Sequence, residues 1–144
     1  MPSLVMDQPP VIVDASVAVE LAVGSRTDIP AAWQSWLAAE RMLMAPAVHW
    51  TEVGHALLRR MDRIAYRAAE RFATLQDAGV TTADRGPAGV RFALELAERH
   101  RLSVYDATYL WLAIDVDGEL ATLDRDLARA AEAEGVALAI PLGA

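Results

Sequence analysis

Four acidic residues, far apart in the chain, fall at or next to the expected ends of strands or the first turns of helices: Asp14, Glu52, Asp106 and Asp124. Asp14 directly follows the apolar run Val11–Val13, and the carboxyl end of a buried strand is where open α/β sheets place their ligands. Clustered carboxylates without nearby cations usually imply a bound divalent metal ion. The four acids are therefore candidate ligands of one metal site.

Asp14 and Asp124 also have a purely structural interpretation. Both stand where a helix N-cap is expected, and aspartate is favoured there because its carboxylate accepts hydrogen bonds from free backbone N–H groups. Capping does not conflict with metal binding, since one carboxylate oxygen can bind the ion while the other accepts from the backbone. Asp126, two residues beyond Asp124, is a competing candidate for the same role.

Asp106 and Glu52 are ambiguous for other reasons. Asp106 ends a Ser-x-x-Asp pattern that starts at Ser103 and precedes an apolar run, which is typical of a capping box. Glu52 shares a helix face with Arg59, so a solvated ion pair is the alternative interpretation. Helix capping alone is nevertheless a poor explanation for all four acids, because all four are expected at strand ends or helix starts around one sheet. The set therefore favours a shared site more than any single member does.

Composition narrows the function classes. The chain contains no cysteine, which excludes disulfides, thiolate metal sites and cysteine nucleophiles. It contains no lysine either, since all 13 basic residues are arginines, and this argues against a P-loop and against phosphoaspartate chemistry. The net charge of −7 argues against tight nonspecific binding of nucleic acid. This net charge does not exclude an enzyme that binds phosphates through a metal ion and a local arginine patch.

The length of 144 residues and the apolar fraction of 54% predict one globular domain. Residues 1–10 are polar, end in two prolines and are expected to form a short tail, followed by a single domain over residues 11–144. The first residues lack the basic and apolar regions of a signal peptide, and no run of about 18 apolar residues is present. We therefore expect a soluble, cytoplasmic protein that does not enter a membrane.

Short apolar runs alternate with longer segments of helical periodicity. The expected strands are Val11–Val13, Met42–Ala45, Val80–Thr82, Leu120–Thr122 and Val136–Ile140. The expected helices are Ser16–Val23, Ile29–Arg41, Ala47–Asp62, Ala65–Asp77, Pro87–His100, Ser103–Val116 and Asp124–Glu134. This alternation predicts a three-layer α/β/α fold around a central, mostly parallel sheet of about five short strands.

Four sequence segments carry a family resemblance. They are Val-Ile-Val-Asp14-Ala-Ser16, Glu52-Val-Gly-His-Ala-Leu, Leu102-Ser-Val-Tyr-Asp106-Ala-Thr-Tyr-Leu and Ala121-Thr122-Leu-Asp124-Arg-Asp-Leu-Ala. In combination they resemble a PIN domain, and more closely the VapC-type ribonuclease toxins of bacterial and archaeal toxin–antitoxin modules. The resemblance spans residues 11 to about 140, which is essentially the whole domain.

The resemblance implies that four residues are catalytic and bind Mg²⁺, with Mn²⁺ as the alternative ion: Asp14, Glu52, Asp106 and Asp124. Ser16 or Thr122 would support these acids, and Asp126 would be a possible assistant. His55 departs from the pattern, because relatives often carry an asparagine three residues after the glutamate. A hard cation held by such carboxylates lowers the pKa of bound water, which can then attack a phosphodiester.

The resemblance further implies a metal-dependent endoribonuclease that hydrolyses RNA and is inhibited by a cognate VapB-like antitoxin. It also implies a homodimer, and exposed apolar residues on the first two helices would form the groove for the antitoxin. Two alternatives remain. One is another metal-dependent phosphodiesterase or nuclease acting on DNA or small nucleotides. The other is a non-catalytic PIN-like binding module, which would be expected to have lost one or more of the acids.

Contacts with the substrate have a weaker signal in the sequence. Arg59, Arg63, Arg67 and Arg71 recur every four residues and would form a basic stripe on one continuous helix. A helix break is expected near residues 62–64, which would split the stripe. The alternative is a solvated face whose arginines pair with neighbouring acids rather than with phosphates.

Overall fold

Four short parallel strands form the central sheet of the computed structural model, which describes residues 8–140. The strands are β1 (Val11–Val13), β2 (Leu43–Ala45), β3 (Val80–Thr82) and β4 (Glu119–Ala121). Their order across the sheet is β3-β2-β1-β4, and Val11 of β1 lies beside Leu43 of β2 and Glu119 of β4. Because all pairings are parallel, the carboxyl ends of the strands meet at one edge, where α/β folds place their ligands.

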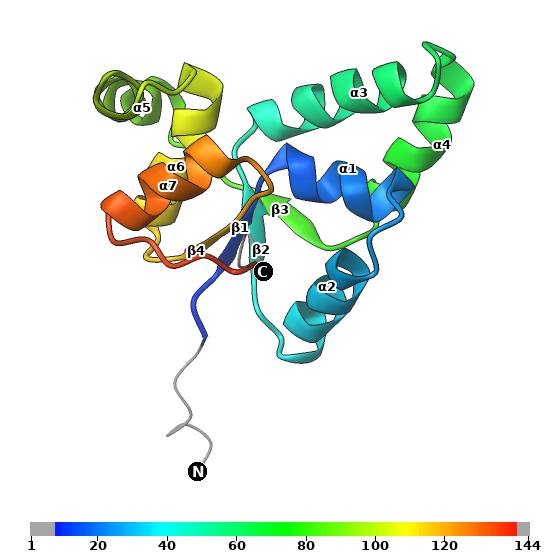
Figure 1. Ribbon diagram of the computed structural model, residues 1–144, viewed down its shortest axis with the longest axis horizontal. Helices are drawn as coiled ribbons and strands as arrows, with labels where there is room; N and C mark the ends of the chain where they lie inside the picture. The colour runs from blue at the N-terminus through cyan, green and yellow to red at the C-terminus, as the bar shows by residue number, and fades with distance from the viewer. Residues whose placement is uncertain (1–7, 141–144) are drawn as a thin grey trace.

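Seven helices lie among residues 8–140, and they carry the chain back to the starting edge of the sheet between strands, as parallel pairing requires. They are α1 (Ala15–Val23), α2 (Asp28–Ala38), α3 (Val48–Arg60), α4 (Ala65–Gln76), α5 (Gly86–His100), α6 (Val104–Asp115) and α7 (Arg125–Ala133). Figure 1 shows α1 to α4 on one side of the sheet and α5 to α7 on the other. The three-layer α/β/α prediction is confirmed.

Each face of the sheet has its own hydrophobic core. Side chains alternate between the two faces along a strand, so Val11 and Val13 of β1 enter the core shared with α1 to α4. Ile12, between them, enters the core shared with α5, α6 and α7. All three side chains are 0% exposed, which explains why this central strand is apolar throughout rather than alternating with polar residues.

The expected elements agree with the structure except at two ends. Helix α2 stops at Ala38, three residues before the expected end, and the expected fifth strand forms only one isolated bridge, between Leu138 and Leu120. Two backbone hydrogen bonds flank this bridge: Leu120 N–H donates to Ala137 (2.9 Å) and Ala139 N–H donates to Leu120 (2.8 Å). Residues 8–140 therefore contain a four-stranded sheet with one further strand-like contact beside β4.

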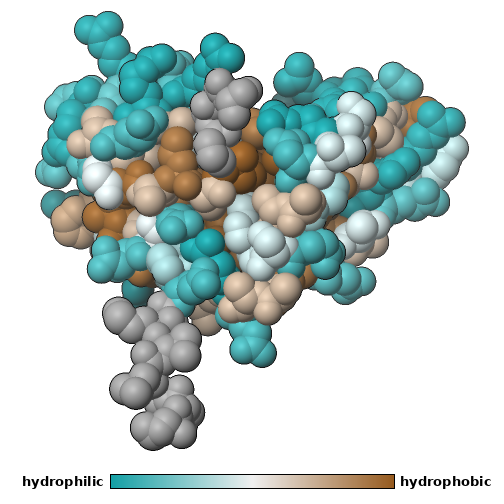
Figure 2. Space-filling view, turned by 60° about the horizontal axis from the view of Figure 1, so that its bottom comes forward, coloured by the Kyte–Doolittle hydropathy of each residue, from teal (hydrophilic) through white to brown (hydrophobic). Residues whose placement is uncertain are grey.

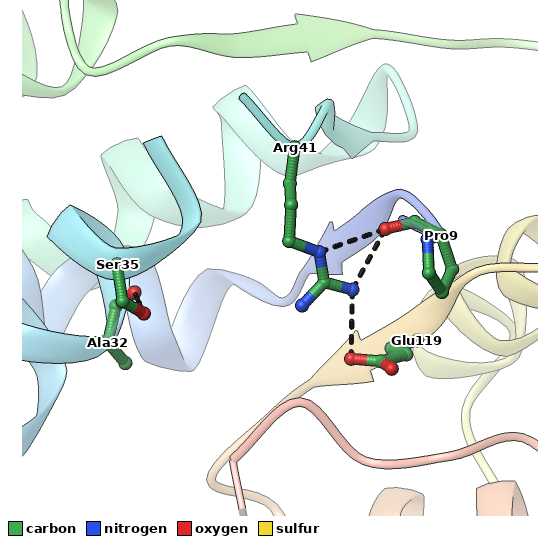
Figure 3. A network of polar contacts seen from close by, with 5 residues as sticks. All are labelled: Pro9, Ala32, Ser35, Arg41 and Glu119. Atoms are coloured by element: carbon green, nitrogen blue, oxygen red, sulfur yellow. Dashed lines mark hydrogen bonds and ion pairs between the residues drawn. The ribbon is translucent and has the colours of Figure 1, made fainter. Parts of the chain in front are cut away.

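The last residues of the expected N-terminal tail are anchored to the domain. The guanidinium group of Arg41 donates two hydrogen bonds to the carbonyl oxygen of Pro9, from Nε (3.0 Å) and from Nη2 (2.8 Å). Nη2 also lies 2.9 Å from Oε1 of Glu119 (Figure 3). The Pro10 carbonyl accepts from Glu119 N–H, so these contacts join the starts of β1, β2 and β4. Residues 1–7 of that tail lie outside the described part of the chain.

Exposed apolar side chains are unevenly distributed. Figure 2 shows one face of the molecule, on which apolar surface in the middle is bordered by hydrophilic side chains. Leu37 is the only large apolar side chain exposed on the described helices α1 and α2, whereas α5 exposes Val90, Phe92 and Leu94. The expectation of an apolar groove on the first two helices is therefore not met. None of the helices in residues 8–140 has the length and hydropathy needed to cross a membrane.

Candidate active site

A cleft of about 940 Å³ opens at the carboxyl ends of the strands. Its walls come from α1, α3, the start of α6 and the loop between β4 and α7. It is lined by all four acids that the sequence indicated: Asp14, Glu52, Asp106 and Asp124. Asp14 and Asp124 reach the same cleft because they follow β1 and β4, which are neighbours in the sheet.

Asp14 is buried at the end of β1 and is held by two hydroxyl groups. Ser16 Oγ donates to Asp14 Oδ2 at 2.7 Å, and Thr122 Oγ1 donates to the same oxygen at 2.8 Å. Asp14 makes no side-chain capping hydrogen bond to α1 within the described residues, so the capping interpretation fails for it. Burial raises the pKa of Asp14 despite these hydroxyl donors, and the nearby Asp124 raises it further. A buried carboxylate with no cationic partner is the kind of group that a metal ion would neutralise.

The two hydroxyl groups also fix the loop that carries Asp124. Ser16 Oγ accepts from Leu123 N–H (3.0 Å), and Thr122 Oγ1 accepts from Asp124 N–H (3.0 Å). Thr122 is 0% exposed, so this network is shielded from solvent at its centre. Both residues from which support was expected, Ser16 and Thr122, donate a hydrogen bond to Asp14.

Asp124 is a helix cap and a cleft residue at once. Its Oδ1 accepts from Asp126 N–H (2.9 Å) and from Leu127 N–H (3.3 Å), which caps α7. The same side chain lines the cleft. Asp126 does not line it: its carboxylate is 75% exposed and lies 3.2 Å from Nη1 of Arg129. Of the two competing candidates, the structure brings Asp124 to the other acids.

Asp106 lies in the first turn of α6, and its carboxylate lines the cleft. The cap of this helix is Ser103, whose hydroxyl accepts from Asp106 N–H at 3.0 Å. The predicted capping pattern is therefore present, but the serine supplies the cap. Burial raises the pKa of Asp106 to about 6, with further contributions from the charges of Asp14 and Asp124.

Glu52 lies on α3, partly buried, with its side chain on the wall of the cleft. Burial raises the pKa of Glu52, and the charges of Asp14 and Asp106 add to the effect. Its Oε1 atom is buried and has no hydrogen-bond partner among the described residues. Glu52 also forms no ion pair within residues 8–140, so the alternative interpretation, a solvated pair with Arg59, is absent there.

The chemistry of these donors suits a hard divalent cation. Four carboxylates face one space, three of them have raised pKa values, and one buried oxygen has no partner. Each of these features opposes bringing the acids together unless a positive charge joins them. In the described part of the chain, however, no three such side chains are already close enough to form a complete metal centre.

Several cleft residues were not identified as site residues from the sequence. Arg60 of α3 lies 3.3 Å from Glu20 of α1, and this ion pair spans the cleft wall. Arg59 and His55 line the same wall on α3, whereas Tyr105 precedes Asp106 and is exposed. His55 and Arg59 lie three and seven residues after Glu52, so they share its helix face, as the sequence already indicated for Arg59.

The predicted arginine stripe is split, as the expected helix break implied. Arg59 belongs to α3, whereas Arg67 and Arg71 belong to α4, and Arg63 lies in the turn between them with a φ of 61°. Arg71 donates from Nη1 to the Ala22 carbonyl (3.2 Å), which ties α4 to α1. Of the four arginines in the stripe, Arg59 is the one that lines the cleft.

Comparison with known proteins agrees with this fold. The sequence matches the PIN domain family over residues 11–133, which is most of the chain. This protein therefore belongs to the PIN domain family. No curated protein sequence gives a significant match.

Solved structures extend the comparison to individual proteins. PAE2754 from Pyrobaculum aerophilum is 24% identical, with a TM-score of 0.65 and coverage of 85% of this chain and 79% of that one. The Mycobacterium tuberculosis toxin VapC20, described as cleaving the sarcin–ricin loop, is 18% identical, with a TM-score of 0.65 and coverage of 83% and 94%. VapBC2 from Rickettsia felis, bound to a DNA fragment from its promoter, is 11% identical, with a TM-score of 0.69 and coverage of 89% and 96%. At these identities the likeness establishes the fold.

Proposed function

We propose that this protein is a Mg²⁺- or Mn²⁺-dependent endoribonuclease of the VapC kind, which hydrolyses phosphodiester bonds of RNA. The observation that carries the proposal is the convergence of Asp14, Glu52, Asp106 and Asp124 on one cleft. Membership of the PIN domain family and the likeness in fold to VapC20 support it. RNA is favoured as the substrate because VapC20 is described as cleaving the sarcin–ricin loop.

The residues of the cleft would have three different roles: binding the ion, orienting Asp14 and attracting the phosphates of the substrate. Asp14, Glu52, Asp106 and Asp124 would hold the ion, which supplies an activated water and stabilises negative charge on the phosphate. Ser16 and Thr122 would keep the Asp14 carboxylate oriented, since both donate to its Oδ2 atom. Arg59 and Arg60 on the cleft wall would attract the phosphodiester backbone, whose contacts position a nucleic acid without reading its sequence.

We further propose that a VapB-like antitoxin inhibits the protein and that the protein forms a homodimer. The likeness to the VapBC2 complex from Rickettsia felis supports an antitoxin partner. The exposed apolar side chains of α5 offer an interaction surface, in place of the expected groove on the first two helices. Co-expression with neighbouring small genes followed by co-purification tests the partner, and light scattering tests the dimer. Repeated failure to co-purify a partner under native conditions would count against the antitoxin.

A cleavage assay tests the proposed activity. Purified protein is incubated with structured RNA and, separately, with DNA of the same sequence, in Mg²⁺, Mn²⁺ or EDTA. We expect cleavage of RNA only, dependent on the ion and abolished by Asp14→Asn. The matched control is Asp77→Asn, which changes an exposed acid at the end of α4, away from the cleft. Cleavage that survives both EDTA and Asp14→Asn contradicts the carboxylate mechanism, and cleavage of DNA alone contradicts the choice of substrate.

A further inference from the structure

A buried histidine and a buried tyrosine lie on the two helices that carry Glu52 and Asp106, and they have no role in the proposed activity so far. His49 of α3 and Tyr109 of α6 are both 0% exposed. The Nδ1 atom of His49 lies 3.1 Å from the hydroxyl oxygen of Tyr109, and the two rings meet edge to face at 6.0 Å. This contact joins helices from the two opposite layers of the fold.

The surroundings of His49 determine where its proton lies. Burial lowers the pKa of His49 to about 4, so at neutral pH the ring is uncharged and carries one proton. Its Nε2 atom is buried without a hydrogen-bond partner in the described part of the chain. A proton on Nε2 would bury an unpaired donor, whereas a proton on Nδ1 leaves only an unpaired lone pair, which costs less. The proton therefore belongs on Nδ1, from which it is donated to the Tyr109 oxygen.

This assignment leaves the Tyr109 hydroxyl free to donate its own hydrogen. Glu52 lies one helical turn after His49 on α3, on the same side of the helix. Burial raises the pKa of Glu52, and the Tyr109 hydroxyl, as a hydrogen-bond donor, lowers it in part. Oε1 of Glu52 is buried and has no hydrogen-bond partner within residues 8–140. The Tyr109 hydroxyl and the Glu52 carboxylate are thus neighbours. The hydroxyl lacks an acceptor for its hydrogen, and the carboxylate lacks a donor for its Oε1 atom.

We propose that Tyr109 is a positioning residue for Glu52: its hydroxyl, oriented by His49, donates to the Glu52 carboxylate and holds it toward the cleft. The donor chain runs from His49 Nδ1–H to the Tyr109 oxygen and from the Tyr109 O–H to Glu52. The inference rests on the proposed function only in taking Glu52 as a ligand of the ion. A hydrogen bond from Tyr109 would hold the Glu52 carboxylate in one orientation on the cleft wall, although Glu52 forms no ion pair within residues 8–140.

Binding of Mn²⁺ to the full-length protein, measured by calorimetry without RNA, tests the role of Tyr109. We expect Tyr109→Phe to weaken Mn²⁺ binding by about tenfold to a hundredfold, as loss of a partner that orients a metal ligand does. The matched control is Tyr66→Phe, which removes an exposed hydroxyl from α4 and should leave the affinity unchanged. Unchanged Mn²⁺ affinity in Tyr109→Phe, or no Mn²⁺ binding by the unmodified protein, overturns the inference.

The tautomer of His49 is tested separately in the unmodified protein. Nitrogen NMR of the ¹⁵N-labelled imidazole should show the proton on Nδ1 at neutral pH, and a proton on Nε2 overturns the proposed donor chain. His49→Leu should weaken Mn²⁺ binding as Tyr109→Phe does, whereas His49→Asn, which retains an N–H donor, should restore part of it. If Mn²⁺ binds with the expected pattern but no RNA is cleaved, only the proposed function fails.

Discussion

Asp14 combines three properties that conflict in the absence of an ion: it is acidic, it is buried, and the charge of another acid, Asp124, acts on it. The hydroxyl groups of Ser16 and Thr122 satisfy one of its oxygens but cannot cancel its charge. Natural proteins retain such costly groups where function needs them. A residue that we propose as a metal ligand is therefore one without which the metal-free protein should fold better.

Asp14→Asn should separate activity from stability. Asparagine keeps the size of the side chain and an oxygen that can accept from Ser16 and Thr122, but it removes the buried charge. We expect cleavage of RNA to fall by at least about a hundredfold, because a ligand should matter no less than its supporting partners do. The free energy of unfolding in EDTA should be equal to or higher than that of the unmodified protein. A clear loss of stability in EDTA would contradict this view of Asp14.

Asp106 should make the stability of the metal-free protein depend on pH. Its pKa in the folded protein is about 6, above the ordinary value of 3.8, so the folded state binds more protons between these values. The stability contributed by this group therefore rises as the pH falls from 7 toward 4. Urea unfolding in EDTA should show the unmodified protein gaining stability relative to Asp106→Asn over this range. His49 opposes this trend, but both proteins contain it, so the comparison cancels its effect.

At the scale of elements, the site depends on two segments that follow neighbouring strands. Asp14 follows β1 directly and Ser16 lies in the first turn of α1, whereas Thr122 and Asp124 lie in the loop after β4. Two hydrogen bonds of the Ser16 and Thr122 hydroxyls join these segments: Thr122 donates to Asp14, and Ser16 accepts from Leu123 N–H. The other two, from Ser16 to Asp14 and from Asp124 N–H to Thr122, are local to one segment each. The relative position of two candidate ligands is therefore set by the hydroxyl groups between them.

Thr122→Val should remove one of the two hydrogen bonds that join the segment after β1 to the loop after β4. Valine has the shape of threonine but can neither donate to Asp14 nor accept from Asp124 N–H. We expect a loss of about 1–3 kcal/mol in the free energy of unfolding, because buried partners are left unsatisfied. Mn²⁺ affinity should fall by about tenfold or more. Thr122→Ser keeps the hydroxyl and should retain most of both properties, and equal losses in the two variants would contradict a role specific to the hydroxyl group.

The elements also mark the limit of prediction from sequence. The run Val11–Val13 followed by Asp14 predicts a buried strand with a carboxylate at its end because both signals are local. The run Val136–Ile140 has the same composition, yet it makes a single bridge to Leu120, because the length of a strand depends on the partner available at the sheet edge. His49 gave no signal either, since its role depends on Tyr109, which lies in another layer of the fold.

At the scale of the whole molecule, the negative net charge opposes binding of an RNA substrate. A protein with a net charge of −7 repels RNA overall, so attraction must come from the few cations that reach the cleft. Arg59 and Arg60 line the cleft, and Arg60 is paired with Glu20. Arg59 is therefore the cation of the cleft wall that we expect to meet a phosphate.

Arg59→Gln should weaken RNA binding more than it slows the chemical step. With binding measured in EDTA by fluorescence anisotropy, we expect the slope of log K against log salt to become shallower by about one unit. In cleavage assays KM should rise several-fold while kcat changes little. Arg67→Gln, on α4 outside the cleft, has the same charge change and serves as the control. Equal effects of the two substitutions would indicate bulk charge rather than a specific phosphate contact.

The two separate cores have a consequence for how the site comes into being during folding. Glu52 is carried by α3, which packs in one core, and Asp106 is carried by α6, which packs in the other. A chain with either layer undocked lacks one wall of the cleft and one of its acids. No half-folded intermediate can hold the four carboxylates together. In refolding experiments, high-affinity Mn²⁺ binding should therefore appear only with the final docking of the second layer.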